Sequence, residues 1–203
     1  MKKIFYCFLI SFPFLGMSQI REKGDIEFAP IIGYSASYHL HSVVLSAPPI
    51  SGVQFGLYGD YFLNDRWSIR SGLLYQHMGT EKIYFAFFNS DYSETTNYIT
   101  LPMTMNLHFG STRKWYLNYG VSIGTLIGAK ADYYDGSGYV DIKDIVYTFQ
   151  VGINGGIGYK FEISPKFSIA IENANMWGLT KTTKEKKGNN FYMSFNVGGI
   201  FKL

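Results

Sequence analysis

Apolar residues recur at every second position over stretches longer than ten residues, which restricts the folds open to this chain. Side chains alternate between the two faces of a β-strand, so this period indicates strands with one apolar face. Segments 98–109 and 115–128 show the pattern. The clearest case is the C-terminal stretch, where one face carries Phe191, Met193, Phe195, Val197, Gly199, Phe201 and Leu203. Soluble strands average about 5–6 residues, whereas membrane-crossing strands need about 9–11, so the lengths favour membrane-crossing strands.

Eight strands and their connections follow from the same reading. We expect the strands at about 25–38, 51–63, 66–79, 96–109, 115–130, 144–161, 166–178 and 190–203. Short connections alternate with long ones near 39–50, 80–95, 131–143 and 179–189. Short periplasmic turns and longer external loops are typical of outer-membrane barrels, and an even strand count places both chain ends on the periplasmic side. Pro102 cannot donate to a strand ladder, so it is expected to mark a bulge.

The first 18 residues resemble a Sec-type export signal. Lys2 and Lys3 precede an apolar run from 4 to 16, which is too short to span a bilayer comfortably, and small residues suggest cleavage after Ser18. We therefore expect a signal peptide at 1–18 and one barrel domain at 19–203. Cys7, the only cysteine, lies within that run without a lipoprotein-type motif, so the mature chain would contain no disulfide.

The direction of the apolar face separates a membrane barrel from a soluble ligand-binding barrel. Charged residues make up only 16% of the chain, and the less apolar face consists mainly of small residues that would fill a narrow lumen. The strand charges fall on that small, polar face: Glu27, Asp60, Arg70, Lys160, Glu172 and Lys202. Three acids and three bases predict a paired lumen network, because unpaired buried charge is expensive. The fold class is therefore all-β, an eight-stranded antiparallel up-and-down transmembrane β-barrel.

Aromatic residues in the strands indicate the membrane boundaries. Aromatic residues near strand ends are expected to form interfacial girdles: Tyr38, Trp67, Trp115 and Trp177.

The net charge of +3 falls to about +1 when the two lysines of the signal are removed, so no nucleic-acid partner is expected.

Four short stretches resemble the PorT-like outer-membrane β-barrel family. They are Asn64-Asp65-Arg66-Trp67-Ser68-Ile69-Arg70-Ser71-Gly72-Leu73-Leu74-Tyr75, Tyr98-Ile99-Thr100-Leu101-Pro102-Met103, Trp115-Tyr116-Leu117-Asn118-Tyr119-Gly120 and Asn196-Val197-Gly198-Gly199-Ile200-Phe201. The resemblance implies an eight-stranded outer-membrane barrel with no common catalytic site or cofactor. The chain departs from the usual terminal aromatic residue of such barrels, since it ends in Leu203 with Phe201 two positions earlier.

Only weak candidates for metal binding or catalysis are present. His39 and His41 point the same way on an extended segment, and four acids lie in one loop: Asp132, Asp135, Asp141 and Asp144. Neither set matches a known zinc or calcium spacing, so we expect solvated loops, with no metal or cofactor. His77, with a nearby serine, would be needed for an enzyme acting on lipid.

The expected function is a structural or interaction role through the external loops, without a wide pore and without enzymatic activity. The expected partners are outer-membrane lipid and lipopolysaccharide, the barrel assembly machinery during insertion, and an unidentified protein at the loops. The basic segment 181–187 is the candidate lipopolysaccharide contact. A lipid-modifying enzyme and a soluble ligand-binding barrel are the alternatives.

Overall fold

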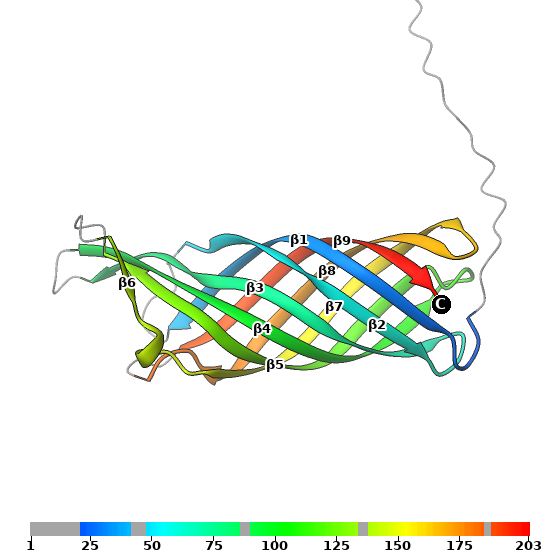
Figure 1. Cartoon of the computed structure of the whole chain (residues 1–203), viewed down its shortest axis with the longest axis horizontal. Helices are drawn as coiled ribbons and strands as arrows, with labels where there is room; N and C mark the ends of the chain where they lie inside the picture. The colour runs from blue at the N-terminus through cyan, green and yellow to red at the C-terminus, as the bar shows by residue number, and fades with distance from the viewer. Residues whose placement is uncertain (1–20, 42–47, 86–89, 134–137, 185–187) are drawn as a thin grey trace, which may run out of the picture.

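The strands of the chain close into a barrel, as seen in a computed structural model (Figure 1). The structure describes residues 21–41, 48–85, 90–133, 138–184 and 188–203, without the side chains of 39–41, 82–85 and 90–92. The expected signal peptide, Asp135 and the end of the basic segment lie outside these residues. Within the described residues, no helix is long and apolar enough to cross a bilayer.

Eight long antiparallel strands form the wall. They are β1 (Ile26–His41), β2 (Ile50–Phe62), β3 (Trp67–Phe85), β4 (Ser90–Phe109), β5 (Trp115–Asp132), β7 (Phe149–Ser164), β8 (Phe167–Lys181) and β9 (Gly188–Lys202). Each pairs with its neighbours in sequence, and pairing of β1 with β9 closes the ring. A short strand, β6 (Tyr139–Asp141), pairs with the end of β5, and η1 (Lys143–Ile145) is a single 3-10 turn. The predicted eight-stranded up-and-down barrel is confirmed.

The loop end of the barrel, opposite the end that carries the C-terminus, differs from the sequence expectation. Strands β3 and β4 continue through much of the segment 80–95 expected to be a loop, and they pair as far as Phe85 and Ser90. The strand expected from 144 instead begins at Phe149, because Ile142 and Val146 turn inward around η1 and become buried. Sequence alternation cannot distinguish such an inward turn from the start of a strand.

Pro102 does not mark a bulge. The pairs Ser71–Met103 and Leu74–Thr100 keep one register on either side of it, and the β3–β4 irregularity lies between Thr80 and Ile83. The Ser71 hydroxyl donates a hydrogen bond of 2.9 Å to the Pro102 carbonyl oxygen. The ladder therefore tolerates the missing N–H without inserting a residue.

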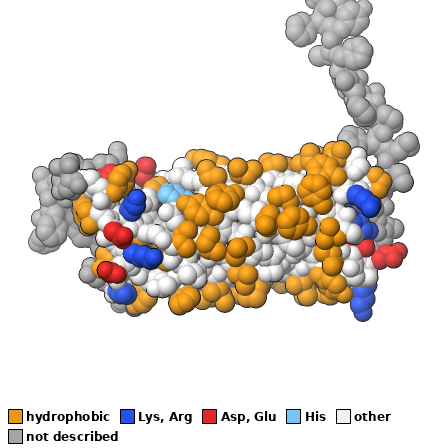
Figure 2. All heavy atoms as spheres, viewed as in Figure 1, with side chains coloured by type: hydrophobic (Ala, Val, Ile, Leu, Met, Phe, Trp, Pro, Cys, Tyr) orange, Lys and Arg blue, Asp and Glu red, His pale blue; other side chains and the backbone are white. Residues whose placement is uncertain are grey.

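On the face of the barrel seen in Figure 2, apolar side chains form a band, and charged side chains gather beyond both of its ends. Outward residues of the band include Ile32, Leu57, Leu73, Ile153 and Val197, which are 45–61% exposed. Aromatic side chains pack at its edges. At the end that carries the C-terminus, called the terminal end below, the ring centroids of Trp115 and Tyr159 lie 4.8 Å apart. At the loop end, Tyr38 stacks on Phe191 with a centroid distance of 5.3 Å. The apolar face therefore points outward, as the small-residue content of the other face predicted.

Candidate functional site

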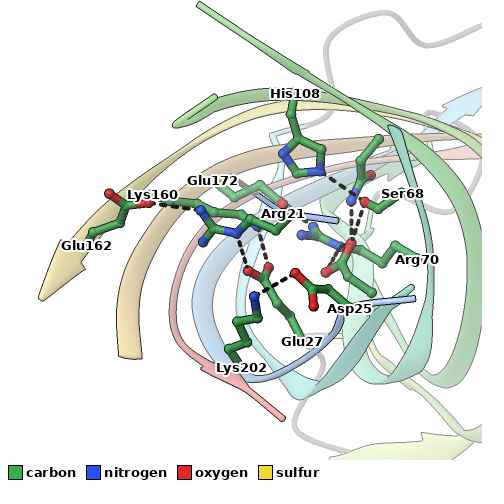
Figure 3. A network of polar contacts seen from close by, with 12 residues as sticks. Arg21, Asp25, Glu27, Ser68, Arg70, His108, Lys160, Glu162, Glu172 and Lys202 are labelled. Atoms are coloured by element: carbon green, nitrogen blue, oxygen red, sulfur yellow. Dashed lines mark hydrogen bonds and ion pairs between the residues drawn. The ribbon is translucent and has the colours of Figure 1, made fainter. Parts of the chain in front are cut away.

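The lumen contains the main concentration of polar side chains, arranged in successive groups along the barrel axis. Nearest the terminal end is the rim cluster, made of Arg21, Glu27, Lys114, Lys160 and Glu162. Farther along the same walls is the inner cluster, made of Asp60, Arg70 and Glu172. Figure 3 shows Glu27, Arg70 and Glu172 inside the ring of strands, with Arg21 and Lys160 beside Glu27.

The rim cluster joins the segment before β1 to β1 and β7. Arg21 Nε lies 2.8 Å from Glu27 Oε1, and Arg21 Nη1 lies 2.9 Å from Glu162 Oε1. Lys160 Nζ lies 2.5 Å from Glu27 Oε2. Burial alone would lower the pKa of Arg21, but the carboxylates of Glu27 and Glu162 raise it above its ordinary value. Arg21 is therefore charged where it covers this mouth of the lumen.

The inner cluster crosses the barrel. Arg70 Nε lies 3.0 Å from Asp60 Oδ2 on the neighbouring strand, and Arg70 Nη1 lies 2.6 Å from Glu172 Oε2 on β8. The guanidinium carbon of Arg70 also lies 4.7 Å and 5.0 Å from the ring centroids of Tyr58 and Tyr116. Charged and aromatic contacts thus hold this guanidinium on several sides, which explains how a side chain only 3% exposed stays ionised.

A serine, a histidine and an aspartate meet beside the inner cluster, but their order differs from that of a catalytic triad. Ser68 Oγ lies 3.0 Å from His108 Nε2 and donates to Asp60 Oδ1 at 3.1 Å. With the hydroxyl proton of Ser68 donated to Asp60, the contact with His108 is a hydrogen bond in the tautomer that carries a proton on Nε2. A catalytic histidine would instead accept the serine proton, with the aspartate orienting the histidine. All three residues are buried, and their contacts join β2, β3 and β4 inside the barrel.

Amide side chains fill the middle of the lumen and form the amide layer. Gln54 Nε2 donates to Asn196 Oδ1 at 3.0 Å, and Gln76 Nε2 donates to Gln54 Oε1 at 2.9 Å. Thr100 Oγ1 donates to Gln76 Oε1 at 2.8 Å, so the chain of bonds reaches β4. Four strands are linked across the interior without a charged group.

Apolar side chains close the lumen at the loop end. This loop-end plug is one buried cluster of Met78, Tyr98, Leu126, Ala129, Ala131, Ile142, Val146, Met176 and Tyr192. Between it and the inner cluster lies a cavity of about 30 Å³, and a second cavity near Tyr58 and Tyr116 measures about 10 Å³. Each of these two volumes holds at most one or a few water molecules.

The sequence-predicted lumen charges largely meet. Glu27, Asp60, Arg70, Lys160 and Glu172 are all buried and paired, whereas Lys202 is half-buried at the rim and pairs with Asp25 at 2.6 Å. The sequence did not indicate three members of the rim cluster, which are Arg21, Lys114 and Glu162. It also did not indicate that Ser68 and Asn106 bond Asp60, or that His108 lies beside them. The even spacing of Lys160 and Glu162 on one strand could have indicated the shared face of those two residues.

The weaker candidates do not assemble in the described part of the chain. No three His, Cys, Asp or Glu side chains lie close enough there to hold a metal ion. Asp141 Oδ1 accepts a hydrogen bond from the Lys143 backbone, and Asp144 lies in η1. The backbone of His39 and His41 belongs to β1, but their side chains lie outside the described residues. His77 Nδ1 lies 2.7 Å from Asn97 Oδ1.

Comparisons with known proteins agree with this architecture. No curated protein matches the chain in sequence. Among solved structures, the outer membrane protein AlkL in lipid bilayers is 9% identical, with a TM-score of 0.53, covering 90% of this chain and 91% of AlkL. Outer membrane protein W of E. coli is 14% identical, with a TM-score of 0.50, covering 90% of this chain and all of that chain (100%). Both show the fold alone.

The family comparison covers most of the barrel. Residues 17–184 match the family described as "Outer membrane protein beta-barrel domain". An apolar outer band, aromatic edges and a polar lumen are the features that this family needs in order to sit in a bilayer. This chain therefore belongs to the family of bacterial outer-membrane β-barrel domain proteins.

Proposed function

We propose that the protein is a sealed outer-membrane scaffold that acts through its external segments, and that it is neither a diffusion pore nor an enzyme. The charge balance of the lumen carries the proposal. Arg21, Arg70, Lys114 and Lys160 face Glu27, Asp60, Glu162 and Glu172, four cations against four anions. In a conducting channel, charged side chains would face water and moving ions. Here they form ion pairs with one another instead.

Planar-bilayer recording tests the absence of a pore. The purified barrel is expected to give no steady channels, while a wide porin reconstituted in the same lipid provides the positive control. Large, persistent conductance in the wild-type protein would refute the proposal. Uptake of a small sugar into protein-containing vesicles gives a second, independent measurement.

The absence of enzymatic activity is supported by the proton arrangement at Ser68 and His108 and by the contact of His77 with Asn97. The purified barrel can be incubated with lipopolysaccharide, and its acyl chains compared by mass spectrometry before and after. We expect an unchanged acyl pattern. Loss or transfer of an acyl chain would establish the enzyme alternative.

Lysines at the loop end support contact with lipopolysaccharide phosphates. Lys130, Lys143, Lys181 and Lys184 are exposed there. Added lipopolysaccharide is expected to raise the temperature at which the folded barrel loses its fast gel migration. Lys181→Glu should reduce that increase, whereas Lys166→Glu, an exposed lysine at the terminal end, should not. An equal response of both variants would contradict a contact at the loop end.

A protein partner at the external segments and a PorT-like role remain parts of the same proposal. Co-purification from native outer membrane in mild detergent would identify such a partner. Insertion by the barrel assembly machinery is expected to depend on the final strand, where Phe201 is 44% and Leu203 80% exposed. Phe201→Ala should then reduce the amount of folded barrel more than Leu203→Ala.

A further inference from the structure

Two asparagines interrupt the apolar outer face of β8. The outward positions on either side of them are Ile169, Ile171, Trp177 and Leu179, which are 37–54% exposed. Asn173 and Asn175 lie between these residues with half-buried side chains. Both amides therefore lie within the band that faces hydrocarbon, where polar side chains are rare and usually have a specific role.

The hydrogen bonds of this pair are incomplete. Asn175 Nδ2 donates to Asn173 Oδ1 at 2.8 Å, and Asn173 Nδ2 donates to the Ser194 carbonyl at 3.3 Å. A second contact of Asn175 Nδ2, with the Gly155 carbonyl, is 3.5 Å long and therefore weak. Asn175 Oδ1 accepts no hydrogen bond from any residue that the structure describes. An acceptor without a donor is costly in a medium that contains no water.

Strand pairing defines the outward residues that surround Asn175. Strand pairing places Gly155 of β7 and Met193 of β9 beside it, and Ala36 of β1 beside Met193. Next to this row lies an outer groove of about 420 Å³. The groove is lined by Trp115, Ile157, Tyr159, Ile171, Phe195 and Val197, together with Asn173. The groove thus reaches Asn173, and Asn175 lies two residues farther along the same outward face of β8.

We propose that this face of β7, β8 and β9 is a contact between two copies of the chain in the membrane, centred on Asn175. A carboxamide presents a donor and an acceptor side by side, so two copies related by a two-fold axis can bond reciprocally, each Asn175 donating to the other. Polar side chains link transmembrane segments in this way. A lipid acyl chain would fill the groove but would supply no donor to Asn175 Oδ1.

The opposite wall provides a contrast. Ser71 is also an outward polar residue, on β3, but its hydroxyl is used by the Pro102 carbonyl within the wall. Its outward neighbours Ile69 and Leu73 are 47% and 54% exposed and apolar. The Ser71 hydroxyl proton is thus used within the wall, and no pair of carboxamides interrupts the outward residues Ile69, Ser71 and Leu73, so we assign the proposed contact to one side of the barrel.

Thiol cross-linking tests the position of the contact. In a Cys7→Ser background, Ile153→Cys places the single thiol beside Gly155 and keeps both asparagines. Leu73→Cys places it on the opposite wall at nearly equal exposure, 54% against 53%. With a short bis-maleimide in native outer membrane, we expect a dimer band for Ile153→Cys and little for Leu73→Cys. Equal cross-linking of the two variants, or none, would overturn the proposal and would favour lipid in the groove.

A second measurement tests the amide itself. Energy transfer between labelled copies in vesicles gives the association constant at a fixed protein-to-lipid ratio. Asn175→Leu is expected to weaken association roughly tenfold, since two reciprocal hydrogen bonds are lost. Met193→Leu, on the same face, removes no hydrogen bond and should associate like the wild type. Gel migration shows that each variant is folded, so wild-type association of Asn175→Leu would refute the role of the amide.

Discussion

Arg70 of β3 and Glu172 of β8 join opposite walls of the barrel through a contact of 2.6 Å between Nη1 and Oε2. The two residues are 102 positions apart in the chain. Arg70 also bonds Asp60, so one guanidinium forms ion pairs with two carboxylates in the lumen. This bridge ties together strands that share no backbone hydrogen bonds.

Removing this bridge should destabilise the barrel strongly. Arg70→Met leaves Asp60 and Glu172 buried without a cation, and breaking a buried pair from one side costs about 3–5 kcal/mol. We expect the folded, fast-migrating gel band to be lost at a clearly lower temperature than in the wild type. Arg66→Met, at an exposed arginine in the neighbouring turn, is the control and should change little. Similar behaviour of the two variants would contradict the role of the bridge.

Opening the rim cluster should not open the lumen. Arg21→Ala removes the ion pairs with Glu27 and Glu162 at the terminal end but leaves the inner cluster, the amide layer and the loop-end plug in place. The expected result is lower thermal stability with no steady conductance in planar bilayers. Channels in Arg21→Ala would show that the rim cluster alone seals the barrel.

The Ser71 hydroxyl should stabilise the β3–β4 pair beside Pro102. Ser71→Ala removes its hydrogen bond to the Pro102 carbonyl, and the expected loss is about 1 kcal/mol in the free energy of unfolding. Urea unfolding in lipid vesicles measures this difference. Ser71→Thr keeps a hydroxyl at the same position and should restore most of the stability; if it behaved like Ser71→Ala, packing rather than the hydrogen bond would be responsible.

Acid should weaken the contact between Asp25, just before β1, and Lys202 at the end of β9. The hydrogen bond from Lys202 lowers the pKa of Asp25 below its ordinary value. The carboxylate therefore adds stability that is fully present above the ordinary aspartate pKa, near 4, and is lost as the pH falls through the lowered value. Asp25→Asn should remove this part of the acid sensitivity. Melting temperatures measured from pH 6 to pH 2 check the prediction; identical pH profiles would contradict it.

The sequence predicts the wall better than the contents of the lumen. Alternation locates the strands because one face of each must meet lipid, and it assigns Glu27 and Lys160 to the inner face. It does not show that these two residues meet, because their contact at 2.5 Å spans 133 positions and depends on the closed register. Arg21 lies before the first strand, where alternation has no meaning, so its position depends on tertiary contacts alone.

The outer face also has features that the alternation of apolar and polar residues does not predict. Asn173 and Asn175 follow the alternation and would be assigned to the lipid side, but nothing in the spacing shows which amide groups remain unbonded. The inward turn at Ile142 and Val146 likewise depends on a space between distant strands. Both features arise from packing after closure.

The balanced lumen charges have a consequence for the order of assembly. Arg21, Glu27, Asp60 and Arg70 precede the middle of the chain, and Lys114, Lys160, Glu162 and Glu172 follow in β5, β7 and β8 or beside them, so each half carries two cations and two anions. Three of the contacts nevertheless cross between the halves: Arg21–Glu162, Lys160–Glu27 and Arg70–Glu172. In a half-inserted sheet, these lumen charges therefore sum to zero before the final partners arrive. When β1 pairs with β9, the crossed ion pairs replace contacts of these side chains with water. We therefore expect the barrel to be hard to reopen once this last strand pairing has formed.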